Sequence, residues 1–366
     1  MNPSEEFCPN WECSARGKIG AGNIGIHSRK EARYRCSCCG KTFSASRGTA
    51  LYGLKHDPDT FTKVVTLLAY GCPIQAAALA FELDERTVRG WMERTGQHCQ
   101  KVHEAVIGNA KLDLGQVQAD ELKVKTQQGP VWMAMAECVP FRLWLGGVLS
   151  KDRDFALIRA LILMVFRIAL CRPLLLAADG LVSYVRAFQE AFRSPLPRTT
   201  PGRPKLRPWD NIAIVQVVKQ RTNAELSVQR RVVQGSADLV QHLLNQTQGG
   251  GQINTAYIER LNATFRQCFA ALTRRGRRLA RLPQTLACGM YLVGTVYNFC
   301  TYHDSLALDL HISPCRRRWL HRTPAIAAGL TDHRWSVSEL LSFKIAPSPF
   351  VPPKRLGRPP KLRTSP

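Results

Sequence analysis

The stretch Asn254-Thr-Ala-Tyr-Ile-Glu-Arg-Leu-Asn-Ala-Thr-Phe-Arg266 has the periodicity of an amphipathic helix. Its apolar residues Ile258, Leu261 and Phe265 recur at steps of three and four, so one stripe of the helix faces a core. The stretch therefore predicts a helix that packs against the rest of a folded domain.

Another face of this expected helix is polar and charged. Glu259, Asn262 and Arg266 fall close together, because residues three, four and seven apart stack along a helix. Asn254 or Thr255 can cap the N-terminus by accepting a hydrogen bond from a free backbone N–H. Glu259 is a candidate catalytic residue, and the ordinary alternative is a solvated glutamate in salt bridges. Two upstream segments help to decide between these two roles.

Residues 115–125 alternate in the manner of a strand and contain the first of two candidate aspartates. Asp120 falls on the more apolar face of this strand, where a buried carboxylate requires a partner or a metal ion. Glu121 is its neighbour and its obvious rival. Strand alternation places Glu121 on the other face, so Asp120 is the candidate.

Residues 173–180 form a continuous apolar run that ends in Asp179-Gly180. This pattern is typical of a strand buried on both faces, whose carboxyl end delivers Asp179 to a crevice. Carboxylates from Asp120, Asp179 and Glu259 could converge on two Mg²⁺ ions, or on Mn²⁺. Two such ions suit the displacement of an oxygen from a phosphodiester.

The order of these motifs resembles the DDE transposases of bacterial insertion sequences. The resemblance rests on Ala119-Asp-Glu, on Ala178-Asp-Gly and on the helix motif at residues 257–266. It extends to residues 297–306 and 322–331, which are similar to the closing motifs of that family. The resemblance implies a ribonuclease H-like (integrase-type) catalytic core in which the three acids bind magnesium.

Composition favours a polyanionic partner. The chain has 366 residues, a formal net charge of +24 and 45% hydrophobic residues, so a folded protein carries the excess charge. Nucleic acid is the first choice of partner and a membrane surface the second. No apolar run is long enough to span a bilayer and no secretory signal is evident, so we expect a cytoplasmic, nucleoid-associated bacterial protein.

The N-terminal cysteines have the spacing of a structural zinc site. Cys8 and Cys13 form one close pair, and a second pair comes from the Cys36-Ser-Cys38-Cys39 segment. We expect zinc ligation by Cys8, Cys13, Cys36 and Cys39, with Cys38 competing with Cys36 and Cys39 for the role of ligand. The family resemblance also implies an N-terminal zinc ribbon, here residues 1–50.

Residues 55–106 have the sequence pattern of a helix-turn-helix DNA-binding domain. Asp84 can cap the third helix, and Val88 with Trp91 or Met92 can pack inward. The outward residues of this helix would then enter the major groove. A plain three-helix bundle with exposed arginines is the alternative.

Residues 113–310 are expected to form an α/β catalytic core. The strand with Asp120 is followed by expected strands at 131–138 and 143–149, a helix at 152–170 with Asp152 and Asp154 as caps, and the Asp179 strand. This order predicts a mixed sheet flanked by helices, which fits the ribonuclease H-like fold that the resemblance implies. A departure from compact family members is the 79-residue gap between Asp179 and Glu259, which includes a Pro/Arg-rich insertion at 195–210.

Several basic segments could contact DNA. The Gly-Arg-Pro sequences at 202–204 and 357–359 resemble an A·T-hook, with a solvated linker as the equal alternative. A run of arginines follows the glutamate helix and could neutralise phosphates. The expected DNA-contacting residues are Arg86, Thr87, Arg89, Arg94, Arg203, Arg266, Arg274, Arg275, Arg277, Arg278 and Arg358.

Taken together, these features predict a transposase that binds the terminal inverted repeats of its element, cleaves the ends and joins them to target DNA. Joining two ends implies a homo-oligomer on double-stranded DNA, and residues 311–366 are a C-terminal extension with a basic, Pro-rich tail. The alternatives are a catalytically silent, transposase-derived DNA-binding regulator and a stand-alone nuclease.

Overall fold

The computed structural model describes the chain at residues 1–197, 202–222, 225–273, 280, 282–313 and 316–352. These residues form two compact units. One comprises Met1–Gly53 and the segment from Lys344 onward, and the other comprises Leu54–Phe343. Within the described part of the chain, no helix is both long and apolar enough to cross a membrane.

The unit at the N-terminus contains a small antiparallel sheet. Its strands are β1 (Ile24–Ser28), β2 (Arg33–Cys36) and β3 (Thr42–Ser44), in that order, after a short 3-10 turn at Pro3–Glu5. Four cysteines, with Tyr34 and Phe43, make up most of its core. A core this small is marginal without a cross-link or a metal.

The C-terminal segment belongs to this same unit. Lys344 forms an ion pair with the buried Glu6, and the Ile345 N–H donates to the Gly48 carbonyl at 3.0 Å. Arg16 donates through Nε to the Ser348 carbonyl at 2.9 Å. These bonds join the two ends of the described chain in one unit, which local sequence patterns cannot indicate.

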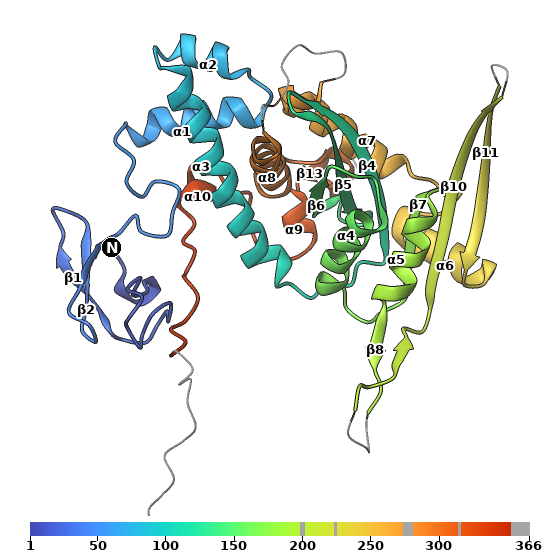
Figure 1. The fold of residues 1–366 in the computed structure, drawn as a ribbon, viewed down its shortest axis with the longest axis horizontal. Coiled ribbons are helices and arrows are strands. Elements are labelled where there is room, and N and C mark those ends of the chain that lie inside the picture. The colour runs from blue at the N-terminus through green and yellow to red at the C-terminus, as the bar shows by residue number, and fades with distance from the viewer. Residues whose placement is uncertain (198–201, 223–224, 274–279, 281, 314–315, 353–366) are drawn as a thin grey trace, which may run out of the picture. The chain divides into compact units, whose positions relative to one another are not determined.

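The larger unit is built on a six-stranded mixed sheet (Figure 1). Its strands are β4 (Gln116–Thr126), β5 (Gly129–Cys138), β6 (Leu143–Ser150), β7 (Leu174–Asp179), β10 (Ile212–Thr222) and β11 (Glu225–Gln234). Their order is β11-β10-β7-β4-β5-β6. β7 runs parallel to β4 and to β10, whereas β5, β6 and β11 pair antiparallel with their neighbours.

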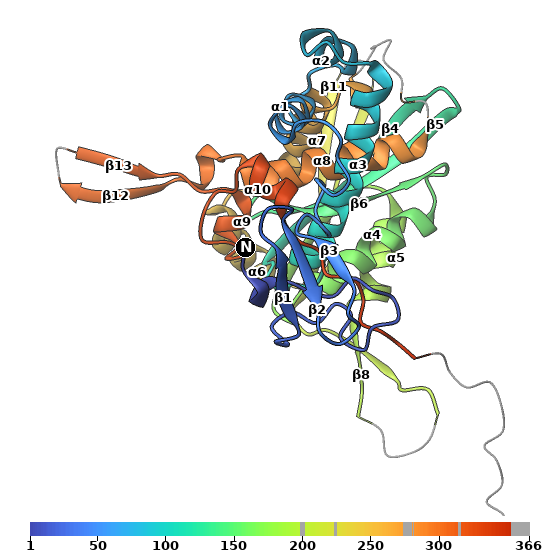
Figure 2. The same ribbon diagram turned by 90° about the vertical axis from the view of Figure 1, so that its left-hand side faces the viewer.

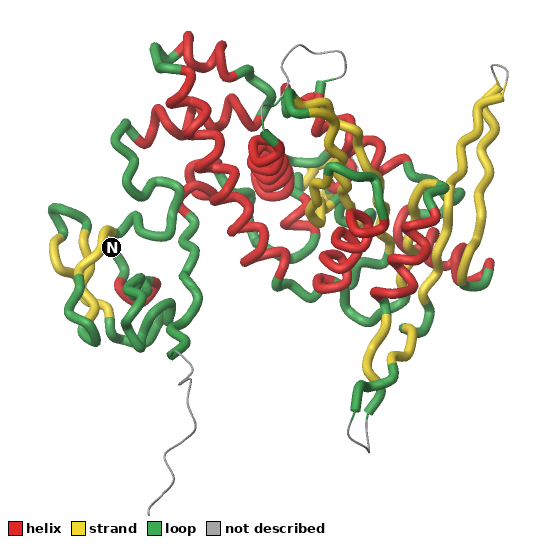
Figure 3. The backbone as a smooth tube through the Cα atoms, viewed as in Figure 1, coloured by secondary structure: helices red, strands yellow, loops and turns green. Residues whose placement is uncertain are grey.

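Helices cover both faces of this sheet (Figure 3). α4 (Phe155–Ile168) and α5 (Val182–Ala191) lie on one face, and α6 (Ala237–Gln248) and α7 (Ala256–Cys268) lie on the other. Leu243 of α6 packs with Leu175 and Ala177 of β7 in a hydrophobic cluster. The mixed, helix-flanked sheet that the sequence predicts is therefore confirmed.

Three helices precede the sheet where the helix-turn-helix is expected. They are α1 (Pro58–Ala69), α2 (Ile74–Ala80) and α3 (Glu85–His103). Asp84 caps α3 by accepting from the Arg86 N–H at 2.7 Å, as predicted. Val88 is buried, and so are both Trp91 and Met92, the two alternatives for the inward-packing residue beside it.

α3 ends within the expected domain and packs against α8 (Pro283–Cys300), which lies outside it. The two helices approach so closely at Gly96 that a Cβ there would lie 2.4 Å from the Cys288 backbone. His98 on α3 also bonds the Leu340 carbonyl at 3.0 Å. α8 in turn packs on β6, where Gly294 makes room for Trp144.

Several elements lie outside what the sequence patterns predicted. They are the π-helix at Glu104–Gly108, the 3-10 helices at Ala270–Leu272 and Asp304–Leu306, the pair β8 (Arg193–Pro195) and β9 (Leu206–Pro208), strand β11, helix α6, the pair β12 (Leu308–Ser313) and β13 (Arg316–Leu320), and the short helices α9 (Pro324–Ala327) and α10 (Val337–Ser342). β12 and β13 form a separate two-stranded ribbon that projects from the helices (Figure 2).

One predicted cap is wrong. The helix expected at 152–170 begins after Asp154, which accepts from the Leu157 N–H at 3.0 Å. Asp152 lies before the helix, and its own N–H donates to Ser150 Oγ. A single cap suffices because only one side chain can occupy the N-cap position.

Candidate functional site

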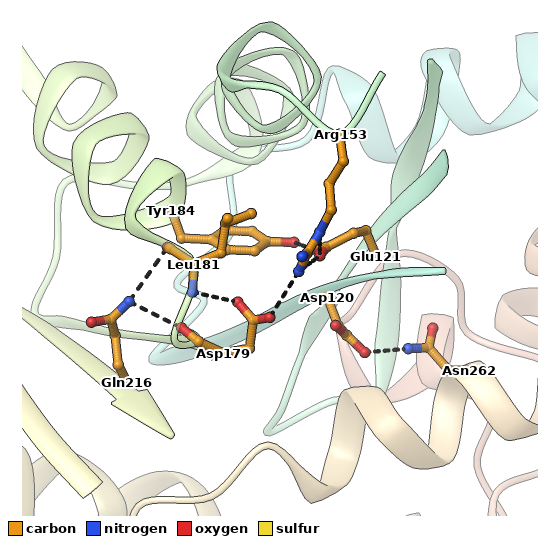
Figure 4. Close-up of polar contacts among 8 residues, drawn as sticks. All are labelled: Asp120, Glu121, Arg153, Asp179, Leu181, Tyr184, Gln216 and Asn262. Carbon is orange, nitrogen blue, oxygen red and sulfur yellow. Dashed lines mark hydrogen bonds and ion pairs between the residues drawn. The ribbon is translucent and has the colours of Figure 1, made fainter. Parts of the chain in front are cut away.

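The two candidate aspartates lie on adjacent parallel strands. In the register of β4 and β7, Ala119 pairs with Ala178, so Asp120 and Asp179 follow side by side. Asp179 ends β7, and its Oδ1 accepts from the Leu181 N–H at 2.9 Å. Gln216 of β10 holds the same turn by donating to the Asp179 carbonyl at 3.0 Å (Figure 4).

Asp120 is a mostly buried carboxylate that faces α7. Its Oδ2 accepts from the side-chain amide of Asn262 at 2.8 Å (Figure 4). Burial, with the negative charges of Glu121, Asp179 and Glu259, raises the pKa of Asp120 to about 6. A cation placed among these carboxylates would relieve that repulsion.

Glu259 lies in the first turn of α7. Gln118, two residues before Asp120, accepts from the N–H groups of Tyr257 and Ile258, each at 3.1 Å, and so caps this helix. Asn254 adds a further cap by accepting from the Ala256 N–H at 3.1 Å. The helix that carries the glutamate is thereby bonded to the strand that carries the first aspartate.

The Glu259 carboxylate is held by two donors. It forms an ion pair with Lys219 of β10 and accepts from Thr255 Oγ1 at 2.7 Å. Burial opposes ionisation of Glu259, but the bonds from Lys219 and Thr255 outweigh it and lower the pKa. Glu259 lines the same cavity of about 770 Å³ as Asp120 and Asp179.

Glu121 lies closer to the aspartates than the alternation of the strand suggested. It faces α5, opposite Asp120, and its Oε2 accepts from the Tyr184 hydroxyl at 2.7 Å. Among the described residues, Asp120, Glu121 and Asp179 nevertheless form a group whose ligand oxygens all lie within 4.8 Å of one another. Glu259 lies outside this group, although it lines the same cavity.

Arg153 is a site residue that sequence patterns did not reveal. It lies between β6 and α4, forms an ion pair with Glu121, and contacts Asp179 Oδ2 at 3.2 Å (Figure 4). Its guanidinium also lies 5.1 Å from the centre of the Trp132 ring. The available signal was its place directly before the Asp154 cap, at the start of a helix beside the sheet.

The N-terminal unit holds a second candidate metal site. Cys8 Sγ lies 3.6 Å from Cys39 Sγ, and Cys13 Sγ lies 3.8 Å from Cys36 Sγ. All four sulfur atoms lie within 4.8 Å of one another. Tetrahedral zinc with Zn–S bonds of about 2.3 Å separates its sulfurs by about 3.8 Å, so this donor set fits zinc.

The choice between Cys36 and Cys38 follows from exposure. Cys38 is exposed and lies outside the group of four, whereas Cys36 is fully buried within it. Burial raises the pKa of Cys36. Hydrogen bonds from the backbone N–H groups of Cys39 and Cys38 and from the Asn23 amide outweigh this effect and lower the pKa to about 6. These bonds favour the thiolate that a metal requires.

The expected DNA-contacting residues fall in three places. Arg86 and Arg89 are exposed on α3, where Thr87 and Arg94 are half-buried. Arg203 is exposed near β9, and Arg266 lines the acidic cavity. The remaining candidates, Arg274, Arg275, Arg277, Arg278 and Arg358, lie outside the described residues.

No family model matches this chain, and no curated protein matches it. Its function must therefore be inferred from its own residues and their geometry.

Proposed function

We propose that this protein is a DDE-type insertion-sequence transposase that cleaves the ends of its element and joins them to target DNA. The observation that carries the proposal is that Asp120 and Asp179 directly follow a paired position of adjacent parallel strands, with Glu259 lining the same cavity. Phosphodiester displacement by two metal ions calls for carboxylates of this kind.

The strand order supports a ribonuclease H-like core. Three antiparallel strands, β6-β5-β4, are followed across the sheet by the parallel strands β7 and β10. The first aspartate lies on β4 and the second at the carboxyl end of β7. This is the arrangement that the family resemblance implies, and β11 adds a strand at its edge.

The residues of the cavity have distinct roles in the proposed reaction. Asp120 and Asp179 would hold Mg²⁺ or Mn²⁺, and Glu259 would complete the site after release from Lys219. When bound, the metal ions activate the attacking oxygen and neutralise charge on the phosphate. Arg266, which lines the same cavity, would contact the phosphate backbone.

The first step hydrolyses a phosphodiester bond, and the second exchanges one phosphodiester bond for another. A water oxygen first attacks the phosphorus at the element's end, and the 3′ oxygen leaves and takes up a proton. The freed 3′-hydroxyl then attacks a target phosphorus and displaces the target's own 3′ oxygen. No nucleotide cofactor is consumed.

Recognition of the ends is assigned to the two N-terminal modules. Arg86 and Arg89 extend into solvent from the start of α3, as a recognition helix in the major groove requires. The cysteine cluster would hold structural zinc. The formal net charge of +24 supports extensive contact with DNA phosphates.

A DNA-binding regulator without chemistry is the second candidate. The ion pair between Lys219 and Glu259 favours it, because this pair neutralises one of the three acids. A regulator would bind the element's ends equally well whether or not that acid is replaced. The two functions therefore differ in cleavage and not in binding.

The test is strand nicking by the purified full-length chain on duplexes that carry the element's own ends. Asp120→Asn, Asp179→Asn and Glu259→Gln should retain end binding and lose Mg²⁺-dependent nicking by roughly a hundredfold or more, since each removes a metal-binding charge. Glu190→Gln is the matched control, because Glu190 is paired with Arg186 on α5. Equal nicking by all four variants would refute the proposal.

A further inference from the structure

Arg153 belongs to neither strand nor helix, yet its side chain is held on three sides. Its backbone lies between β6 and α4, directly before the Asp154 cap. Its guanidinium pairs with Glu121 and Asp179 and lies over Trp132. About a third of the side chain remains exposed, on the wall of the acidic cavity.

Glu121 is the permanent partner of this arginine. Its side chain is 1% exposed, and a buried carboxylate without a partner is strongly destabilising. One of its oxygens receives Arg153 and the other receives the Tyr184 hydroxyl (Figure 4). Both oxygens are therefore committed to the protein, so Glu121 is an anchor for Arg153 and not a free metal ligand.

Asp179, unlike Glu121, has a contact with Arg153 for which a metal ion can compete. Its Oδ1 accepts from the Leu181 N–H, and its Oδ2 lies 3.2 Å from the Arg153 guanidinium. Asp179 also lines the cavity. A divalent cation that binds this carboxylate must compete with the guanidinium for the same negative charge. Two cations side by side repel each other, so one of them must yield.

We propose that Arg153 is a built-in counter-ion, anchored on Glu121, that neutralises Asp179 until a divalent cation replaces it. This inference rests on the proposed function, because it assumes that Asp120 and Asp179 bind the metal. The contact with Glu121 persists when the metal binds, and only the contact with Asp179 is released. Arg153 thereby prevents repulsion among the acids in the metal-free protein and sets the metal concentration at which the site fills.

The test is calorimetric titration of Mg²⁺ into the full-length, zinc-loaded chain without DNA. Arg153→Gln should bind Mg²⁺ about tenfold more tightly, because it removes a competing positive charge from the site. Arg153→Lys retains the charge and should bind within about threefold of wild type. Arg159→Gln is the matched control, because Arg159 lies on α4 and pairs with Glu190, and it should leave the affinity unchanged.

Glu121→Gln separates an anchor from a ligand. Loss of the anchor leaves Arg153 to pair with Asp179 alone, so Mg²⁺ should bind at least about threefold more weakly. The double variant Glu121→Gln/Arg153→Gln should regain the tight binding of Arg153→Gln. If Glu121 were a metal ligand, the double variant would stay weak, and the proposal would fall.

Thermal melting without Mg²⁺ shows whether each variant retains the fold. Unchanged or weaker Mg²⁺ binding by a folded Arg153→Gln, in a protein whose wild type binds Mg²⁺, would overturn this inference alone. Absence of Mg²⁺ binding in wild type would overturn the metal site of the proposed function, and the counter-ion role with it.

Discussion

The side-chain amide of Asn262 on α7 donates to Asp120 Oδ2 on β4 at 2.8 Å, which joins residues 142 positions apart. Together with the cap that Gln118 places on the same helix, this bond fixes the glutamate helix against the strand of the first aspartate. The relative placement of two candidate ligands therefore depends on two neutral side chains, Asn262 and Gln118.

Asn262→Ala should weaken Mg²⁺ binding by roughly threefold, because Asp120 loses the donor that orients its carboxylate. The free energy of unfolding should fall by only about 1 kcal/mol, the usual net value of one hydrogen bond. Calorimetry and urea unfolding measure the two effects. Gln267→Ala, at an exposed position of the same helix, is the control and should change neither.

Glu137 makes the stability of the larger unit depend on pH. It is buried on β5, and its Oε2 has no hydrogen-bond partner in the described part of the chain. Burial raises its pKa from 4.5 to about 8, which nearby Arg142 and Arg260 only partly oppose. Between these values the folded state holds a proton that the unfolded state releases, so stability falls as pH rises through about 8.

Glu137→Gln should remove this dependence. Relative to wild type, it should gain about 4 kcal/mol of stability between pH 4.5 and pH 8. Urea unfolding at both pH values, followed by tryptophan fluorescence, measures the difference. A constant difference at the two pH values would show that Glu137 does not titrate in this range.

Cys13→Ser should abolish zinc binding, because it removes one of the four sulfur donors. Cys38→Ser is the matched control and should retain one zinc per chain, since Cys38 is exposed and outside the cluster. Metal analysis of the purified proteins gives the answer directly. Loss of zinc from Cys38→Ser with retention in Cys36→Ser would reverse the ligand assignment.

Arg86→Ala/Arg89→Ala should weaken binding to the element's ends and flatten its salt dependence. Each lost phosphate contact reduces the magnitude of the negative slope of log K against log salt by about 0.9. Binding titrations at several salt concentrations measure that slope. Arg186→Ala, which removes an exposed arginine from α5, should leave the slope unchanged if α3 is the DNA-contacting helix.

The strands and helix that carry the candidate acids could be predicted from the sequence. The alternation around Asp120, the apolar run that ends at Asp179 and the helical period around Glu259 each reflect burial of one or both faces. α6 offered a similar signal that was missed. Ser236 caps it, and Val240, Leu243 and Leu244 form its buried stripe.

Other parts of the site depend on contacts that no local pattern encodes. Arg153 lies in a connection without periodicity, and its partners are 32 and 26 positions away. Lys219 meets Glu259 only because β10 joins the sheet beside β7. β11 was missed because its residues 227–233 are exposed on both faces, so its sequence shows no alternation between apolar and polar positions.

The most direct test is mobilisation of a marker flanked by the element's own ends, in cells that express wild type, Asp120→Asn, Glu259→Gln or the control Glu190→Gln. Wild type and the control should move the marker, whereas the two site variants should bind the ends and leave the marker in place. Movement of the marker by Asp120→Asn and Glu259→Gln at the wild-type frequency would contradict the assignment of these acids to catalysis.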